Sequence, residues 1–136
     1  YNNVCTGKVW FDGSFPRVDY RKSADEYLEI ARKAQKTLPA PYYPVVTAGW
    51  DSSPRCIQSE TYEAGAYPWM PVMEASPDDF SYAVRCTIEN LLTRPEEERI
   101  FFINAWNEWT EGSYLEPDTR FGMTFLEQLK KVKYER

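Results

Sequence analysis

Three segments of the chain carry apolar residues three or four positions apart, the spacing of one helix face. The first stripe comprises Tyr27, Ile30, Ala31 and Ala34. Ser23 precedes this stripe and Glu26 follows three positions later, which is the pattern of a capping box at a helix start. The sequence therefore predicts a helix from Ser23 to about Thr37.

The second and third stripes predict two further helices. The second comprises Phe80, Val84, Ile88, Leu91 and Leu92, and the third comprises Phe121, Phe125, Leu129 and Val132. Ser76 and Pro77 suit the cap and the first position of the second helix, which we expect to end before Pro95. We expect Asp118 to cap the third helix and Gly122 to weaken it by about 1 kcal/mol relative to alanine.

Two short apolar runs, 43–48 and 100–105, show little of the alternation of a half-exposed strand. Such runs are typical of strands buried on both faces in a parallel sheet. They alternate with the predicted helices, which indicates an α/β fold with parallel strands in a single domain, 1–136. Because two strands leave open sheet edges, we expect further strands outside this sequence.

A polar and aromatic segment follows each predicted strand. The first segment holds Trp50, Asp51 and Arg55, and the second holds Trp106, Asn107, Glu108, Trp109 and Glu111. Parallel strands end at one face of their sheet, so the two segments are expected to share a rim. In a (β/α)8 barrel this face holds the active site in essentially every characterised enzyme.

The two glutamates suit glycoside chemistry, in which one carboxyl group protonates the leaving oxygen and the other acts as base or nucleophile. The flanking tryptophans are expected to exclude water, which favours the protonated form that an acid catalyst requires. The alternative is that Glu108 and Glu111 lie on a loop surface while the tryptophans pack in the core. Two further alternatives stay open: Asp51 could be an Asx-turn residue, and Arg55 could be a structural ion-pair partner.

The composition of the chain argues against several classes of binding and catalysis. The net charge is −5 and no basic patch is visible, which argues against nucleic-acid binding. The sequence has no histidine, which removes Ser-His-Asp and His-metal chemistry, and its three widely spaced cysteines favour neither a disulfide framework nor a zinc site. We therefore expect carboxylate chemistry with no metal and no cofactor. No apolar run approaches the roughly 18 residues of a membrane span.

The segment Asn104–Gly112 resembles the bacterial WbsX-like proteins, which belong with the endo-α-mannosidase relatives of glycoside hydrolase family 99. Within it, Asn107–Gly112 resembles that family's Asn-Glu-Trp-x-Glu-Gly catalytic motif, with Thr110 where the hydrolases usually have histidine. Gly49–Asp51, with Pro54–Arg55 downstream, resembles a second WbsX-like signature. The resemblance implies that the chain is the C-terminal portion, about the last three β–α units, of a (β/α)8 TIM barrel. The other units are expected in sequence that precedes it.

The resemblance also implies a glycoside hydrolase that acts on α-mannoside-like or related polysaccharide linkages with retention. Glu108 is expected as the base on the sugar 2-hydroxyl and Glu111 as the general acid/base. The expected substrate-binding residues are Trp50, Asp51, Arg55, Trp106, Asn107, Trp109 and Tyr114. There are two alternatives. One is a glycosyltransferase of polysaccharide assembly, although no DxD motif is visible. The other is a non-catalytic glycan-binding module. An extracellular or periplasmic location is favoured over a cytoplasmic one, and the chain alone is expected to be inactive.

Overall fold

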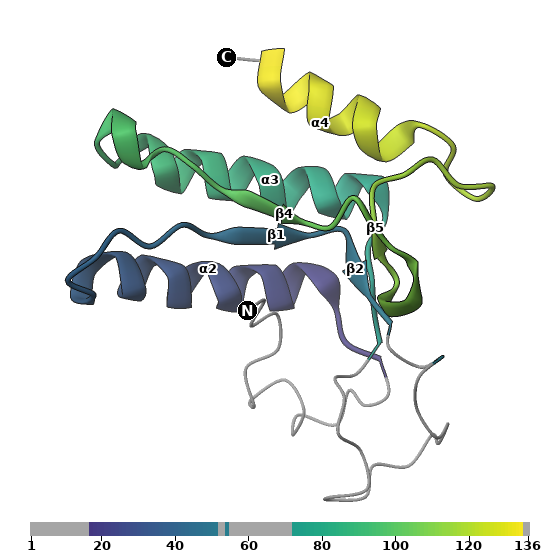
Figure 1. Cartoon of the computed structure of the whole chain (residues 1–136), viewed down its shortest axis with the longest axis horizontal. Coiled ribbons are helices and arrows are strands. Elements are labelled where there is room, and N and C mark those ends of the chain that lie inside the picture. Colours follow the sequence, from purple (N-terminus) through teal and green to yellow (C-terminus); the bar gives the residue numbers. More distant parts are fainter. Residues whose placement is uncertain (1–16, 52–53, 55–71, 135–136) are drawn as a thin grey trace, which may run out of the picture.

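The structure, a computed structural model, describes residues 17–51, 54 and 72–134. Its helices are α2 (Tyr20–Thr37), α3 (Pro77–Leu92) and α4 (Thr124–Tyr134), with two short 3-10 turns, η2 (Glu96–Glu98) and η3 (Trp109–Glu111). Its strands are β1 (Val45–Thr47), β2 (Gly49–Trp50), β3 (Met73–Glu74), β4 (Phe102–Asn104), β5 (Asn107–Glu108) and β6 (Ser113–Tyr114). Figure 1 shows β1 and β4 running along α2 and α3, with α4 beyond α3.

The two principal strands pair in parallel, as predicted. Val45 of β1 lies opposite Phe102 of β4, and Thr47 lies opposite Asn104. With α3 as the connection between them, this is a β–α–β arrangement of the α/β class. Among the described residues these strands form an open two-stranded sheet and no closed barrel.

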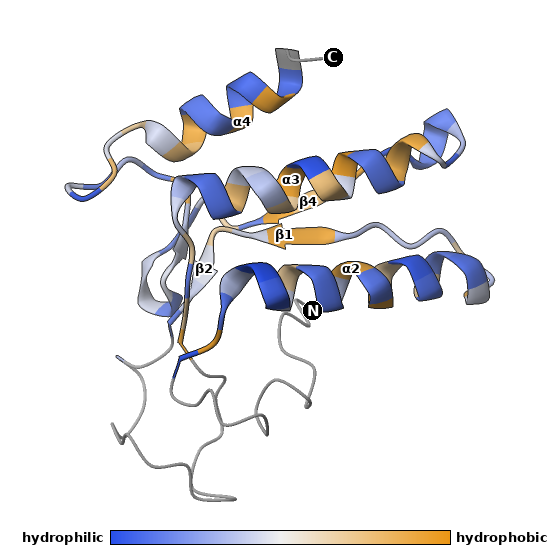
Figure 2. Cartoon of the chain, turned by 180° about the vertical axis from the view of Figure 1, so that it is seen from behind, coloured by the Kyte–Doolittle hydropathy of each residue, from blue (hydrophilic) through white to orange (hydrophobic). Residues whose placement is uncertain are grey.

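The hydrophobic core lies between this sheet and the helices. Phe80 and Val84 of α3 are completely buried, and α3 packs against α2 on one side and α4 on the other. Figure 2 shows that β1 is predominantly hydrophobic, while hydrophobic and hydrophilic bands alternate along α2 and α3. This banding is the pattern of helices with one buried face.

The second strand is not buried on both faces, contrary to the prediction. Phe101 and Ile103 pack against the core, whereas the Phe102 side chain between them is 57% exposed. Successive side chains of a strand point to opposite faces. Only one face of β4 is covered by the described helices, so Phe102 points away from the core.

The start of α3 is confirmed and that of α2 is one turn earlier than predicted. Ser76 Oγ accepts from the backbone N–H of Asp79 at 3.1 Å, while Asp79 accepts from the backbone N–H of Ser76 at 3.3 Å, a reciprocal cap. In α2 the cap is Asp19, and Ser23 lies inside the helix. The extra turn buries the ring of Tyr20, whose hydroxyl donates to the Thr47 carbonyl at 2.5 Å.

The segment before α4 is a turn rather than a helix start, so the prediction for Asp118 and Gly122 is wrong. Asp118 Oδ1 accepts from the backbone N–H groups of Arg120 and Phe121. Gly122 has a φ of +54°, outside the right-handed helical region, and α4 begins two residues later. Gly122 therefore does not weaken the helix, and Phe125 and Val132 still form its buried face.

No helix among residues 17–51 and 72–134 combines the length and apolar character that a membrane crossing needs.

Candidate functional site

The polar segments that follow β1 and β4 lie side by side. The backbone N–H of Asp51 donates to the carbonyl oxygen of Glu111 at 2.6 Å. Glu111 belongs to η3, which forms the tip of an antiparallel hairpin of β5 and β6 with Asn107 opposite Tyr114. The two segments therefore share the rim at the carboxyl ends of the parallel strands, as the sequence predicts.

Two glycines permit this close approach. A Cβ atom on Gly112 would lie 2.8 Å from the Cβ of Asp51 and 2.9 Å from its backbone nitrogen, and the φ of Gly112 is +59°. A Cβ atom on Gly49 would lie 3.0 Å from the Gly112 carbonyl oxygen. Glycine at 112 is thus required both by its left-handed backbone and by the neighbouring main chain.

A buried hydrogen-bond network joins the hairpin to the strand ends. The hydroxyl groups of Thr47 and Ser113 lie 2.9 Å apart, and Asn104 Nδ2 donates to Ser113 Oγ at 2.7 Å. Ser113 Oγ in turn donates to the Asn104 carbonyl oxygen at 2.8 Å. Because Ser113 is completely buried, these bonds fix the hairpin that carries both glutamates.

The two glutamates are half-buried and in contact with their own hairpin. Glu108 Oε1 accepts from the Thr110 hydroxyl at 2.7 Å. Glu111 lies in η3, and its backbone carbonyl oxygen accepts from the backbone N–H of Asp51. Thr110 therefore contacts one of the two candidate catalytic carboxylates directly.

Trp109 forms a fixed aromatic platform beside them. Its ring stacks on Tyr114 with centroids 3.7 Å apart and an interplanar angle of 19°, and its Nε1–H donates to Glu116 Oε2 at 2.7 Å. Trp106 is 54% exposed and Trp109 45% exposed. Both rings are thus partly exposed beside the half-buried glutamates, and the exclusion of water by these tryptophans stays a prediction.

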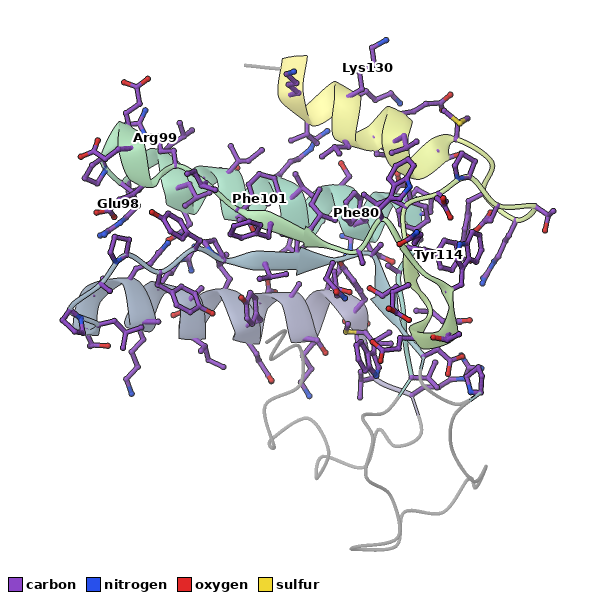
Figure 3. The ribbon with its side chains drawn as sticks, in the orientation of Figure 1. Phe80, Glu98, Arg99, Phe101, Tyr114 and Lys130 are labelled. Carbon is purple, nitrogen blue, oxygen red and sulfur yellow. The ribbon has the colours of Figure 1, made fainter. Side chains whose placement is uncertain are left out.

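A cavity of about 150 Å³ opens on the same rim, and Figure 3 shows Tyr114 at this end of the molecule, opposite Glu98 and Arg99. Its polar and aromatic walls include Trp50, Asp51, Glu74, Tyr114, Asp118 and Arg120. Burial alone would raise the pKa of Asp118, but hydrogen bonds from Phe121, Tyr114 and Arg120 outweigh it and lower that pKa. Burial and the bond to Asp118 raise the pKa of Tyr114.

Most of the predicted site residues come together here. Trp50, Asp51, Asn107, Glu108, Trp109, Glu111 and Tyr114 all belong to β2, the hairpin or their immediate flanks. Trp106 lies just before the hairpin, and its carbonyl accepts from the backbone N–H groups of Leu115 and Glu116. Arg55 lies outside the described residues.

Sequence reasoning missed Thr110 and Arg120 as parts of this rim. Asp118, which the sequence predicts as a helix cap, also lines the cavity. The spacing of Thr110 from Glu108, two positions on a tight turn, could have indicated their contact. No sequence signal indicates Arg120.

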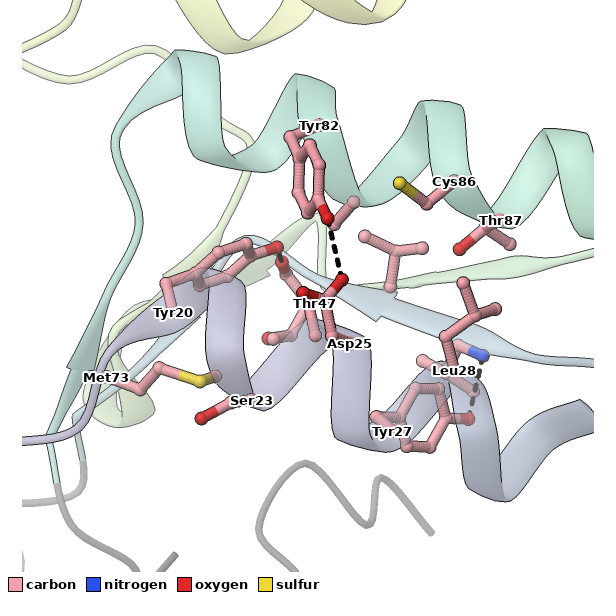
Figure 4. Close-up of a pocket in the computed structure, with 14 residues that line it drawn as sticks. Tyr20, Ser23, Asp25, Tyr27, Leu28, Thr47, Met73, Tyr82, Cys86 and Thr87 are labelled. Carbon is pink, nitrogen blue, oxygen red and sulfur yellow. Dashed lines mark hydrogen bonds between the residues drawn. The ribbon is translucent and has the colours of Figure 1, made fainter.

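A second, small cavity lies away from the rim. It holds about 30 Å³ between α2, α3 and β1, and Figure 4 shows Tyr20, Tyr82 and Cys86 around it. Tyr82 donates to Asp25 at 2.8 Å, which raises the pKa of Tyr82 to about 12, and burial raises the pKa of the Cys86 thiol. This cavity belongs to helix packing, and the Cys86 side chain in its wall is partly exposed.

No set of three or more His, Cys, Asp or Glu residues within 17–51 and 72–134 has a geometry that could hold a metal ion.

Comparison with known proteins identifies the family. The model of the family described as "Glycosyltransferase WbsX" matches residues 4–129, nearly the whole chain. The chain belongs to the WbsX family. The hairpin and the Asp51 segment thus lie within the part of the chain that defines this membership.

Two curated relatives of this WbsX-family chain are proteins named "Uncharacterized protein WxcX", from two strains of Xanthomonas campestris pv. campestris, B100 and ATCC 33913. Each is 33% identical over 117 residues, which is 84% of this chain and 16% of the relative. The chain therefore spans about a sixth of the length of the relatives it matches. No solved structure matches the chain.

Proposed function

We propose that this WbsX-family chain is part of the catalytic domain of a glycoside hydrolase that cleaves α-mannoside-like or related polysaccharide linkages with retention. The observation that carries the proposal is the contact between Asp51 and Glu111, since it joins two carboxylate-bearing segments at the carboxyl ends of parallel strands. The fold part of the proposal is that β1 and β4 are neighbouring strands of a (β/α)8 barrel completed by sequence outside this chain.

In the proposed reaction, Glu108 takes the proton of the sugar 2-hydroxyl while the 2-oxygen attacks C1. Glu111 gives its proton to the glycosidic oxygen as the bond from C1 to that oxygen breaks. The Glu111 carboxylate then takes a proton from water, which opens the anhydro ring at C1, and Glu108 returns its proton to the 2-oxygen. Two inversions at C1 give net retention. The Thr110 hydroxyl supports this role because it orients the Glu108 carboxylate.

The test is turnover of α-mannan fragments by the intact protein that contains this chain. Glu108→Gln and Glu111→Gln are each expected to lower kcat by about 10²- to 10⁴-fold, the usual contribution of a general acid or base. Glu97→Gln, an exposed carboxylate in η2 at the other end of the sheet, is the matched control and should leave kcat unchanged. Wild-type turnover by both site variants would contradict the assignment.

A second candidate is a glycosyltransferase of cell-surface polysaccharide biosynthesis, which the family description favours. That function requires a sugar-nucleotide donor and an acceptor. Donor-dependent transfer by the intact protein, with no hydrolysis of the same glycan, would favour it over the hydrolase. Tight oligosaccharide binding with neither transfer nor hydrolysis would instead indicate a non-catalytic glycan-binding module.

A further inference from the structure

The rim cavity adjoins the candidate catalytic hairpin but is not lined by either glutamate. It lies between the end of β2, β3, β6 and the turn that precedes α4. Gly112, which directly follows Glu111, is part of its wall, as is Asp51. At about 150 Å³ the cavity is about ten times the minimum volume that holds one water molecule, so it admits a larger polar group.

Tyr114 connects this cavity to the aromatic platform. Its ring stacks on Trp109 outside the cavity, and its hydroxyl donates to Asp118 Oδ2 at 3.0 Å inside the wall. Trp50 and Phe121 supply further ring surface to the lining. Aromatic surface beside carboxylate acceptors is the combination that a hydroxyl-rich, partly apolar ligand such as a sugar requires.

The charges of the wall discriminate between classes of sugar. Asp51, Glu74 and Asp118 are carboxylates, and Arg120 is the cation among the described lining residues. Arg120 is already engaged, because its Nη1 lies 3.5 Å from Glu74 Oε1 and its guanidinium carbon lies 4.7 Å from the centre of the Phe121 ring. Glu74 Oε2 also accepts from Arg17 Nη1 at 3.0 Å, so two guanidinium groups stand against the three carboxylates. An anionic sugar would therefore meet excess negative charge, whereas a neutral sugar would meet hydrogen-bond acceptors.

We propose that this cavity is a glycan subsite next to the Glu108–Glu111 hairpin and that it takes a neutral sugar in preference to a uronic acid. The proposal rests on the proposed glycan-directed function and adds to it the subsite, with Trp50, Glu74 and Asp118 in its wall, and its charge selectivity.

The experiment uses the intact protein with Glu111→Gln, so that turnover does not consume the ligand, and with 5-fluorotryptophan in place of tryptophan. The fluorine signal of Trp50 is assigned with Trp50→Phe. Methyl α-mannoside and methyl α-mannuronoside are titrated separately at pH 7. The mannoside should shift the Trp50 signal to saturation, and the mannuronoside should bind about fivefold or more weakly because of like-charge repulsion.

Two further measurements test the cause of the selectivity. Glu74→Gln keeps a hydrogen-bonding side chain but removes one negative charge, so it should narrow the difference between the two ligands. Glu97→Gln removes a distant exposed carboxylate and is the matched control. It should leave the difference in affinity between the two ligands unchanged. If Glu74→Gln fails to fold, raising the salt concentration of the unsubstituted site should narrow the difference instead, since salt screens exposed charges.

The subsite is overturned if saturating mannoside leaves the Trp50 signal unmoved, if the mannuronoside binds as tightly as the mannoside, or if neither charge removal nor salt changes the preference. Its failure is separable from that of the proposed function. Loss of turnover in Glu108→Gln with an unmoved Trp50 signal removes only the subsite. A shifted Trp50 signal in a protein whose turnover survives Glu108→Gln removes only the catalytic assignment.

Discussion

At the scale of single residues, Thr110 is where the motif departs from the hydrolases and also where Glu108 finds a hydrogen-bond donor. Thr110→Val removes the hydroxyl and keeps the branched shape of the side chain. Because a hydrogen bond to a charged group on an exposed turn contributes on the order of 1 kcal/mol, we expect kcat of the intact protein to fall about fivefold. Thr110→Ser should retain near-normal kcat, and equal activity of the two variants would argue against a positioning role.

A comparison of alanine substitutions at Gly112 and Gly122 tests whether the close approach of the two rim segments requires glycine. Both have positive φ, +59° and +54°, but only a Cβ on Gly112 would meet neighbouring backbone, whereas nothing lies within 4 Å of one on Gly122. Gly122→Ala should cost about 1–2 kcal/mol from the left-handed backbone alone. Gly112→Ala should cost more, since the Asp51 backbone must also move.

Thermal unfolding of the two alanine variants measures this difference. We expect Gly112→Ala to have the lower Tm and also to lose turnover in the intact protein, because the shift would separate Asp51 from Glu111. Equal unfolding temperatures would show that the packing of Asp51 on Gly112 is not a constraint.

At the scale of elements, Asp79 links the start of α3 to α2. It accepts from Arg21 Nε at 2.6 Å as well as from Ser76. Burial alone would raise the pKa of Asp79, but these hydrogen bonds outweigh it and hold the pKa below the ordinary value of 3.8. Ionised Asp79 therefore stabilises the folded state above about pH 3.8, and this contribution is lost as the pH falls through the lower folded-state pKa.

Urea unfolding of the wild type and of Asp79→Asn, measured between pH 7 and pH 3, tests this contribution. The wild type should be the more stable protein at pH 7, and the gap in unfolding free energy should shrink at the acidic end. A gap of constant size across this range would be inconsistent with stabilisation by the ionised carboxylate.

The helix starts show what a local pattern could and could not predict. Ser76, Pro77 and Asp79 form one unambiguous start signal, and α3 begins there. At the start of α2 the local pattern predicts Ser23 as the cap, whereas the structure has Asp19, one turn earlier. The choice depends on burial of the Tyr20 ring and its bond to β1, which are tertiary contacts that the helical period does not contain.

The candidate site was also predictable only in part. Its position was predictable because parallel strands end at one face, and this rule needs only the two apolar runs. The contact between Asp51 and Glu111 was not predictable, since it depends on the left-handed backbone of Gly112, which packs against Asp51. The exposure of Trp106 was not predictable either, since it depends on how the hairpin turns, which composition does not determine.

At the scale of the whole molecule, the open sheet bears on activity. In the proposed barrel the site is built from the ends of several strands, and the described part of this chain contains two paired parallel strands, β1 and β4. The 136-residue chain alone is therefore expected to show no turnover of α-mannan fragments that the intact protein degrades. Turnover by the isolated chain at the rate of the intact protein would contradict the partial-barrel proposal.

The effect of Phe102→Ala on stability tests the partial-barrel proposal independently of activity. Its side chain is 57% exposed on the open face of β4, so Phe102→Ala should change the unfolding free energy of the isolated chain by less than about 1 kcal/mol. In a completed barrel the same ring would face a packed interior, where its removal costs about 3–5 kcal/mol. Leu38→Ala, at the exposed end of α2, should cost little in both proteins. If the intact protein tolerates Phe102→Ala as well as Leu38→Ala, no strand layer covers this face.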